Sequence, residues 1–258
     1  MVVTIVIIGI LGVGISSFVG RSTQGMIDTG ERQQLATIAW VVSEKVSREM
    51  RSALPNSIRT GGAGTCIEFI PTIAGSDYLS VPTLAAAIPA ADNFEVVPFP
   101  NYQAGDVNDT QDRVAIYPNT LTNLYNLANP GIISSDFVDQ LSAGVTVNAI
   151  TLTLATAHQF ITDSPTKRIY IVQDPVMYCF AGGLLYRYQG YGFNAVMTTD
   201  ENDLSDQTVM GSRLNSGVFT YTAGDLARSA VVTLAFNVVG DNGATQAINQ
   251  EVQIRNVP

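Results

Sequence analysis

The stretch that decides the fold stands at the beginning of the chain: Met1-Val-Val-Thr-Ile-Val-Ile-Ile-Gly-Ile-Leu-Gly-Val-Gly-Ile-Ser-Ser-Phe-Val-Gly20. It contains no charged side chain, and Arg21 ends the run. About 20 apolar residues in a helix span roughly 30 Å, the thickness of a bilayer core. A secretory signal peptide opens with basic residues, and none precedes this run. Residues 1–20 are therefore predicted to form a transmembrane helix.

The apolar residues continue beyond this run, but with a different spacing. From residue 35 they recur at the i, i+3, i+4, i+7 spacing of one helical face, while charged residues occupy the other faces. The positions expected to pack against a folded head are Leu35, Ile38, Val42, Val46 and Met50. Pro55 stops the pattern. One helix over residues 1–54 would be roughly 80 Å long, transmembrane over 1–20 and amphipathic over 21–54.

After Pro55 the apolar period changes from 3.6 to 2, which predicts a β-rich head over residues 55–258. Long loops are expected over residues 71–112, with one short helix near Leu84–Ala87. The predicted strands are Arg113–Tyr117, Val145–Leu154, Arg168–Gln173, Val176–Phe180, Leu184–Tyr188, Val218–Tyr221, Ala230–Val239 and Glu251–Arg255. The fold class is thus α+β, with a helical spine packed on antiparallel sheets.

Local signals refine this picture of the head. The pair Gly182-Gly183 and the run Asp241-Asn242-Gly243 each separate two predicted strands, which is typical of β-hairpins. The alternation of apolar residues slips phase between Ala149 and Ile150, which indicates a β-bulge.

Charge is unevenly distributed along the 258 residues, whose formal net charge is −9. Residues 1–59 hold six basic and four acidic side chains, whereas the remaining residues hold seven basic and eighteen acidic ones. The head therefore has a net charge of about −11 and repels nucleic acid and anionic lipid. Binding of nucleic acid through bulk electrostatics is not expected.

The two cysteines, Cys66 and Cys179, are widely separated in the sequence. In an exported domain such a pair predicts one disulfide that closes a long loop. The alternative is two unrelated buried thiols, and the cysteine count alone does not decide between them.

The sequence offers no catalytic constellation, so an enzyme is not predicted. His158 is the single histidine, and no serine stands in a Gly-x-Ser-x-Gly turn. A zinc site would need clustered histidine and cysteine ligands, which the chain lacks.

Two acidic loops, over residues 106–112 and 200–206, space oxygen ligands as calcium can use them. The second loop is denser, and its candidate ligands are Asp200, Asp203 and Asp206. Neither loop matches the EF-hand pattern, and acidic loops are usually only solvated. Calcium is the one cofactor that the sequence raises.

An aromatic run provides a candidate ligand site. Tyr186, Tyr188 and Tyr191 lie close together around Gly190. Such rings can stack on a sugar, which would make a surface glycan a partner. Alternating tyrosines on a strand more often pack against a neighbouring sheet or helix.

The apolar run Met-Val-Val-Thr-Ile-Val-Ile-Ile-Gly-Ile-Leu-Gly of residues 1–12 resembles the N-terminal helix of the type IV pilin superfamily. In that family the helix follows a methylation motif, a glycine and then Phe-Thr-Leu-Ile-Glu, and this chain begins where the residue after the glutamate would lie. We therefore expect those residues to be encoded in frame upstream of Met1. The resemblance implies a single pass through the bacterial inner membrane, a periplasmic head and later incorporation into an extracellular pilus (fimbrium). The residues expected to face neighbouring pilins are Ile5, Ile7, Ile8, Ile10 and Leu11.

Further segments resemble particular groups within the superfamily. Residues 44–51 and 53–59 are similar to the end of the spine in minor pilins of the W type and in pseudopilin J of type II secretion. Residues 178–179, 182–188 and 250–258 are most similar to O-type minor pilins of mannose-sensitive haemagglutinin (MSHA) pili. The resemblance implies a non-catalytic minor pilin that acts in pilus biogenesis and surface attachment. A subunit similar to pseudopilin J, and a tip adhesin that binds a glycan or a surface, are the two alternatives.

Overall fold

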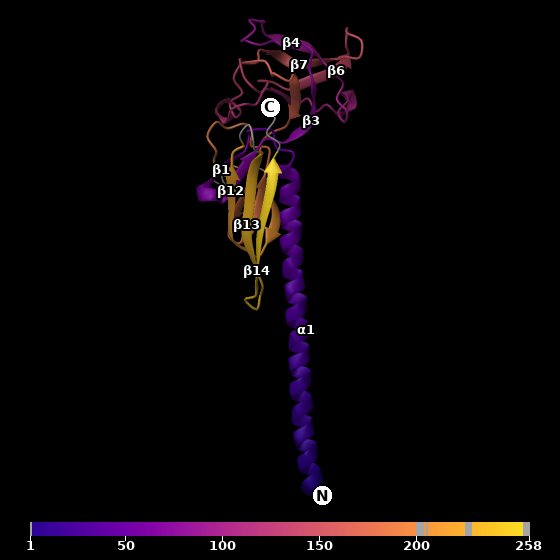
Figure 1. Ribbon diagram of the computed structural model, residues 1–258, viewed down its shortest axis with the longest axis vertical. Coiled ribbons are helices and arrows are strands. Elements are labelled where there is room, and N and C mark those ends of the chain that lie inside the picture. Colours follow the sequence, from indigo (N-terminus) through magenta and orange to yellow (C-terminus); the bar gives the residue numbers. More distant parts are fainter. Residues whose placement is uncertain (1, 200–203, 205, 225–228, 255–258) are drawn as a thin grey trace.

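The computed structural model describes residues 2–199, 204, 206–224 and 229–254. Its dominant feature is α1, Val2–Met50, a single unbroken helix of 49 residues that projects far beyond the head (Figure 1). The α+β fold predicted from the sequence is confirmed, because this long apolar helix packs on a β-rich head of antiparallel sheets.

The helix ends four residues earlier than the position of Pro55 suggests. The Ala53 N–H donates to the Met50 carbonyl at 3.1 Å, and the Leu54 N–H donates to the Ile70 carbonyl at 2.8 Å. The chain therefore leaves the helix in order to pair with the head before proline forces it out. Three short 3₁₀ turns complete the helical elements of the described residues: η1 (Gly62–Gly64), η2 (Ala104–Asp106) and η3 (Leu121–Asn123).

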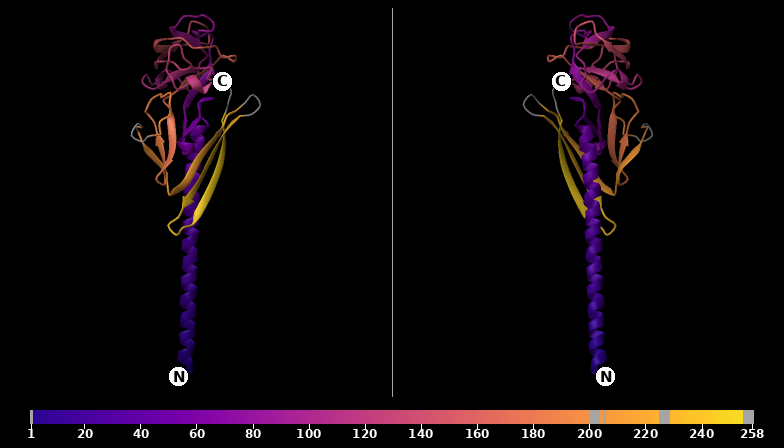
Figure 2. Two further views of the ribbon diagram at one scale, coloured as in Figure 1. Left: turned by 90° about the vertical axis from the view of Figure 1, so that its left-hand side faces the viewer. Right: turned by 90° about the vertical axis from the view of Figure 1, so that its right-hand side faces the viewer.

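The part of the head beside α1, here called the helix-side lobe, contains two antiparallel sheets. A five-stranded sheet of order β1-β2-β9-β10-β11 consists of Arg59–Gly61, Cys66–Phe69, Val176–Ala181, Leu184–Tyr188 and Thr208–Ser212. A three-stranded sheet of order β12-β13-β14 consists of Leu214–Thr222, Ala230–Val239 and Thr245–Ile254. The two sheets flank the C-terminal half of the helix (Figure 2).

The rest of the head forms a distal lobe at the end of the molecule opposite the N-terminus (Figure 1). Its first sheet, of order β3-β8-β5, consists of Thr72–Asp77, Arg168–Val172 and Arg113–Ile116. Its second sheet, of order β4-β7-β6, consists of Ala91–Val96, Ile150–His158 and Val138–Ala143. All six strands lie in the sequence between β2 and β9, which pair with each other. The distal lobe is therefore an insertion within one strand pair, with its own buried core.

Both predicted hairpins are present. Gly182 and Gly183 join β9 to β10 with φ values of +56° and +79°, the left-handed conformation that a two-residue hairpin turn requires. The turn around Asp241–Gly243 joins β13 to β14, and Gly243 has a φ of +83°.

Three predictions for the distal lobe are wrong. Val145–Ala149 is a turn and the strand begins at Ile150, so the phase slip marks a strand start and not a bulge. This turn closes because the Gly144 N–H donates to the Ala149 carbonyl and the Glu95 carboxylate accepts N–H donors from residues 145 and 146. Leu84–Ala87 is a turn and not a helix, and residues 71–112 contain β3 and β4 besides loops.

Candidate assembly interface

The N-terminal half of α1 makes no contact with the head. Every residue from Val2 to Ile27 is exposed, and no charge occurs before Arg21. The residues predicted to face other subunits share this exposure, for example 69% for Ile8: they are Ile5, Ile7, Ile8, Ile10 and Leu11. The helix is long and apolar enough to span a membrane. An apolar surface of this extent does not stay in water, so lipid or protein must cover it.

The C-terminal half of α1 is docked on the helix-side lobe. Of the residues predicted to face the head, Leu35, Val42, Val46 and Met50 are buried and Ile38 is half-buried. They pack with the apolar side chains of β13 and β14 in one core cluster. On the other flank of the helix, β11 approaches α1 closely, because a Cβ at Gly211 would lie 2.5 Å from the Val42 side chain. The stripe with a period of 3.6 is therefore the docking face.

Two polar contacts hold the ends of this docked segment, and the sequence analysis did not identify either. At the upper end, the Glu49 carboxylate accepts from Arg187 Nε at 3.0 and 3.1 Å and from the Tyr178 hydroxyl. Burial, together with the neighbouring Glu49 charge, raises the pKa of Tyr178 above its usual 10, so the hydroxyl stays a donor. At the lower end, Glu31 Oε1 accepts from the Asn242 N–H at 3.1 Å, at the tip of the β13–β14 hairpin.

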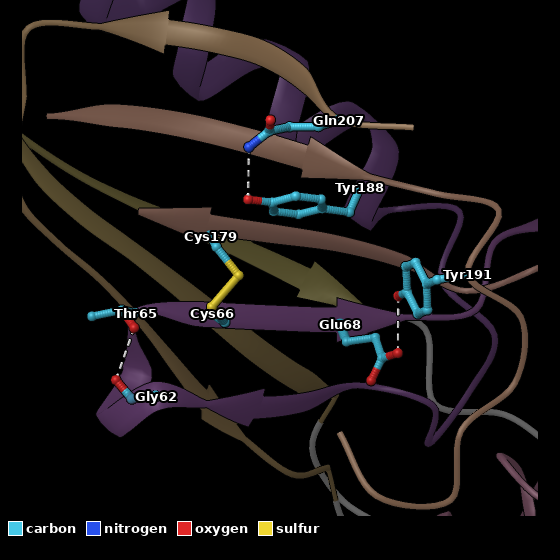
Figure 3. The surroundings of a disulfide bond; sticks show 8 residues. All are labelled: Gly62, Thr65, Cys66, Glu68, Cys179, Tyr188, Tyr191 and Gln207. Carbon is cyan, nitrogen blue, oxygen red and sulfur yellow. Dashed lines mark hydrogen bonds between the residues drawn. A yellow bond between two sulfur atoms is a disulfide. The ribbon is translucent and has the colours of Figure 1, made fainter. Parts of the chain in front are cut away.

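The predicted disulfide is present at the root of the distal lobe. Cys66 of β2 and Cys179 of β9 lie directly opposite each other in the strand pair, with their Cα atoms 4.2 Å apart (Figure 3). Because the distal lobe lies between the two cysteines in sequence, the bond clamps the two strands through which that lobe joins the helix-side lobe.

The three candidate ligand tyrosines pack in or against the cluster that contains this disulfide instead of forming an open platform. Figure 3 shows two of them, Tyr188 and Tyr191. Tyr188 is 1% exposed and its hydroxyl accepts from Gln207 Nε2 at 3.0 Å. Tyr191 is half-buried and donates its hydroxyl to Glu68 at 2.9 Å, and Tyr186 packs partly buried beside the same cluster. Two of the three residues thus serve packing and hydrogen bonding, and the ring of Tyr188 is not accessible for stacking on a sugar.

The calcium prediction falls largely outside the described residues, since Asp200 and Asp203 are not among them. Asp206 is described and exposed. No group of three acidic, histidine or cysteine side chains in the described ranges is placed to hold a metal ion. In the other acidic loop, the buried Asp112 accepts from the Tyr102 hydroxyl, the Asn108 N–H and Gln173 Nε2. Protein donors therefore occupy both carboxylate oxygens of Asp112.

The single histidine is a core residue. His158 is fully buried, and its Nδ1 lies 3.2 Å from both the N–H and the hydroxyl of Ser135. Burial lowers its pKa. The hydrogen bonds of the described residues do not connect it to a carboxylate that would complete a catalytic triad.

The arrangement defines a class of molecule: a membrane-capable apolar helix whose second half is the spine of a β-rich head, as in the pilin-like fold. Comparison with protein-family models, with curated proteins and with solved structures found no match to this chain.

Proposed function

We propose that the chain is a minor type IV pilin, a non-catalytic structural subunit of a pilus or of its tip complex. The observation that carries the proposal is the division of one continuous helix into a docked half and a wholly exposed apolar half. A helix that served only as a membrane anchor would not need to continue as the rigid core of its own head. A subunit that packs through its helix into a filament needs both properties in one rod.

The proposed mechanism exchanges one apolar environment for another. In the bacterial inner membrane, lipid covers residues 2–20 while the head lies in the periplasm. On assembly, the helices of neighbouring pilins replace the lipid around these residues. Close packing of side chains between the helices then stabilises the filament. The docked half transmits the position of the helix to the head, because its buried apolar face and the Glu31 and Glu49 contacts hold the two together.

The test is a charge placed in the exposed apolar half. In Ile8→Asp, a carboxylate at the middle of the span costs about 3 kcal/mol, which eleven other Val, Ile, Leu and Phe residues of residues 2–20 oppose. We expect the variant to remain in the membrane fraction and to fall at least tenfold in purified filaments. The matched control is Val145→Asp, which places the same charge on a side chain that is 95% exposed in the distal lobe.

Immunoblots of the membrane and filament fractions measure both quantities. Filaments that contain Ile8→Asp at the amount of Val145→Asp would show that the exposed apolar half does not pack against other subunits. The proposal would then be wrong.

A further inference from the structure

Strand β14 is a long edge strand. All ten of its residues, Thr245–Ile254, pair with β13 in an unbroken register. Its other side pairs with no strand of the described residues. It therefore presents a row of main-chain N–H and C=O groups, which is a template for one more strand.

Unlike the other sheet edges of the helix-side lobe, β14 carries little of the usual protection against such pairing. The opposite edge of its own sheet, β12, is interrupted by a register shift between Asn215 and Val218. In the five-stranded sheet, the edge strands β1 and β11 have only three and five residues, and the pairing of β11 also shifts register. In contrast, β14 has no proline, no lysine, no bulge and a single charge, Glu251. Natural proteins block edges that must stay unpaired.

Two glutamines identify the main-chain groups of β14 that point outward. Gln246 Nε2 donates to the Ala247 carbonyl, and Gln250 Nε2 donates to the Glu251 carbonyl, each at 3.1 Å. These carbonyls are four residues apart and so lie on the same side of the strand, the side that β13 leaves free. Asn249, midway between them, has the same orientation. Its N–H thus points to the outer edge.

A groove runs along this outer edge. Its volume is about 390 Å³, and it lies between Ala36, Trp40 and Ser43 of α1 and residues 246–250 of β14. Trp40 is the single tryptophan of the chain and is 67% exposed, whereas Ala39 beside it is buried beneath the sheet. The sheet therefore leaves the indole uncovered. No charged side chain lines the groove, so an uncharged occupant fits it.

The position of the groove indicates what fills it. β14 extends alongside α1, and Figure 1 shows it as the strand of its sheet nearest the helix. In a filament whose subunits pack side by side through their N-terminal helices, a neighbouring head can supply the strand. We propose that the outer edge of β14 pairs with an uncharged strand of a neighbouring subunit's head, which covers Trp40 with an apolar side chain. This inference rests on the proposed function, because it needs subunits packed side by side.

Backbone hydrogen exchange of the full-length wild-type protein tests the pairing directly. Exchange of the β14 amides is compared between purified filaments and the detergent-solubilised subunit. We expect exchange at the outward positions 247, 249 and 251 to slow at least tenfold in filaments. Equal rates in the two states would overturn the inference.

A pair of variants at one position provides the second measurement. Asn249→Pro removes an outward N–H that β13 does not use, and Asn249→Ala is the matched control that keeps it. We expect filaments to contain at least fivefold less Asn249→Pro than Asn249→Ala. The two detergent-solubilised variants should have the same melting temperature. Equal incorporation would overturn the inference.

These results separate the inference from the proposed function. If Ile8→Asp is excluded from filaments while β14 exchanges freely in them, the strand pairing is wrong and the pilin proposal stands. If Ile8→Asp is incorporated normally, the proposed function fails first.

Discussion

Removal of the Cys66–Cys179 disulfide should destabilise the head strongly, because the bond closes a loop with a sequence separation of 113 residues. In the chain-entropy model, closing a loop of this length lowers the entropy of the unfolded chain enough to stabilise the fold by about 4.8 kcal/mol. The two cysteines already face each other across β2 and β9, so the native strand pair can persist after reduction. The predicted loss of stability therefore comes from the greater entropy of the unfolded chain once the cross-link is removed.

The assay is guanidinium unfolding of the full-length protein in a non-ionic detergent, followed by tryptophan fluorescence and far-ultraviolet circular dichroism. With a denaturant dependence of about 5 kcal/mol per molar, the midpoint should fall by about 1 M. Reduced wild-type protein and the Cys66→Ala, Cys179→Ala double variant should shift alike. Agreement between them separates the cross-link from the loss of two sulfur atoms packed against Tyr188.

A midpoint shift below about 0.3 M in reduced protein would refute this reasoning. It would mean that the reduced, unfolded chain keeps the two strands together, so that closing the loop adds little. Unfolding of the distal lobe alone, before the helix-side lobe, would refute a different step, because the insertion would then not share its stability with the strands that carry it.

Two further predictions concern the docked helix and the tyrosines. Met50→Ala removes a fully buried side chain and should lower the free energy of unfolding by about 2 to 4 kcal/mol. Met26→Ala, at a side chain that is 75% exposed on the same helix, should change it by less than about 0.5 kcal/mol. Both are measured by guanidinium unfolding in detergent, and equal effects would contradict the docking face. Burial raises the pKa of six tyrosines above the usual 10, so an unfolded chain releases protons near pH 10 that the folded chain retains, and stability should fall as the pH rises above 10. The six buried tyrosines are Tyr78, Tyr102, Tyr125, Tyr178, Tyr191 and Tyr221. An ultraviolet titration should show that one group of tyrosines ionises near pH 10 and that another ionises only together with unfolding. A single transition for all tyrosines near pH 10 would contradict the burial of these six.

The sequence predicted those elements whose cause is local. The rod follows from an uncharged run and then a period of 3.6, and both are read within a few helical turns. The β9–β10 hairpin follows from two glycines that accept positive φ. Strand Ala230–Val239 was predicted with its observed bounds because one face is buried along its whole length, which imposes strict alternation.

Elements that depend on residues far away in the sequence were not predicted. Strands β3 and β4 contain Ala, Gly, Ser, Asp and Asn, which do not favour strands, and they form because β8 and β7 pair with them. Val145 and Val147 resemble strand residues, yet Glu95 from another strand holds that segment as a turn. In such places pairing partners override local propensity.

By itself, the sequence determined that an apolar rod continues into a one-sided spine and that the remaining chain is a β-rich head, since periodicity depends only on neighbouring residues. Only the tertiary structure decided that the distal lobe is an insertion within the β2–β9 pair, that Glu49 meets Arg187 across 138 residues, and that Tyr188 is buried beside the disulfide. It also decided that no strand of the described residues pairs with the outer edge of β14, beside Trp40. These facts depend on which strands pair, and pairing is a property of the whole chain that local spacing does not encode.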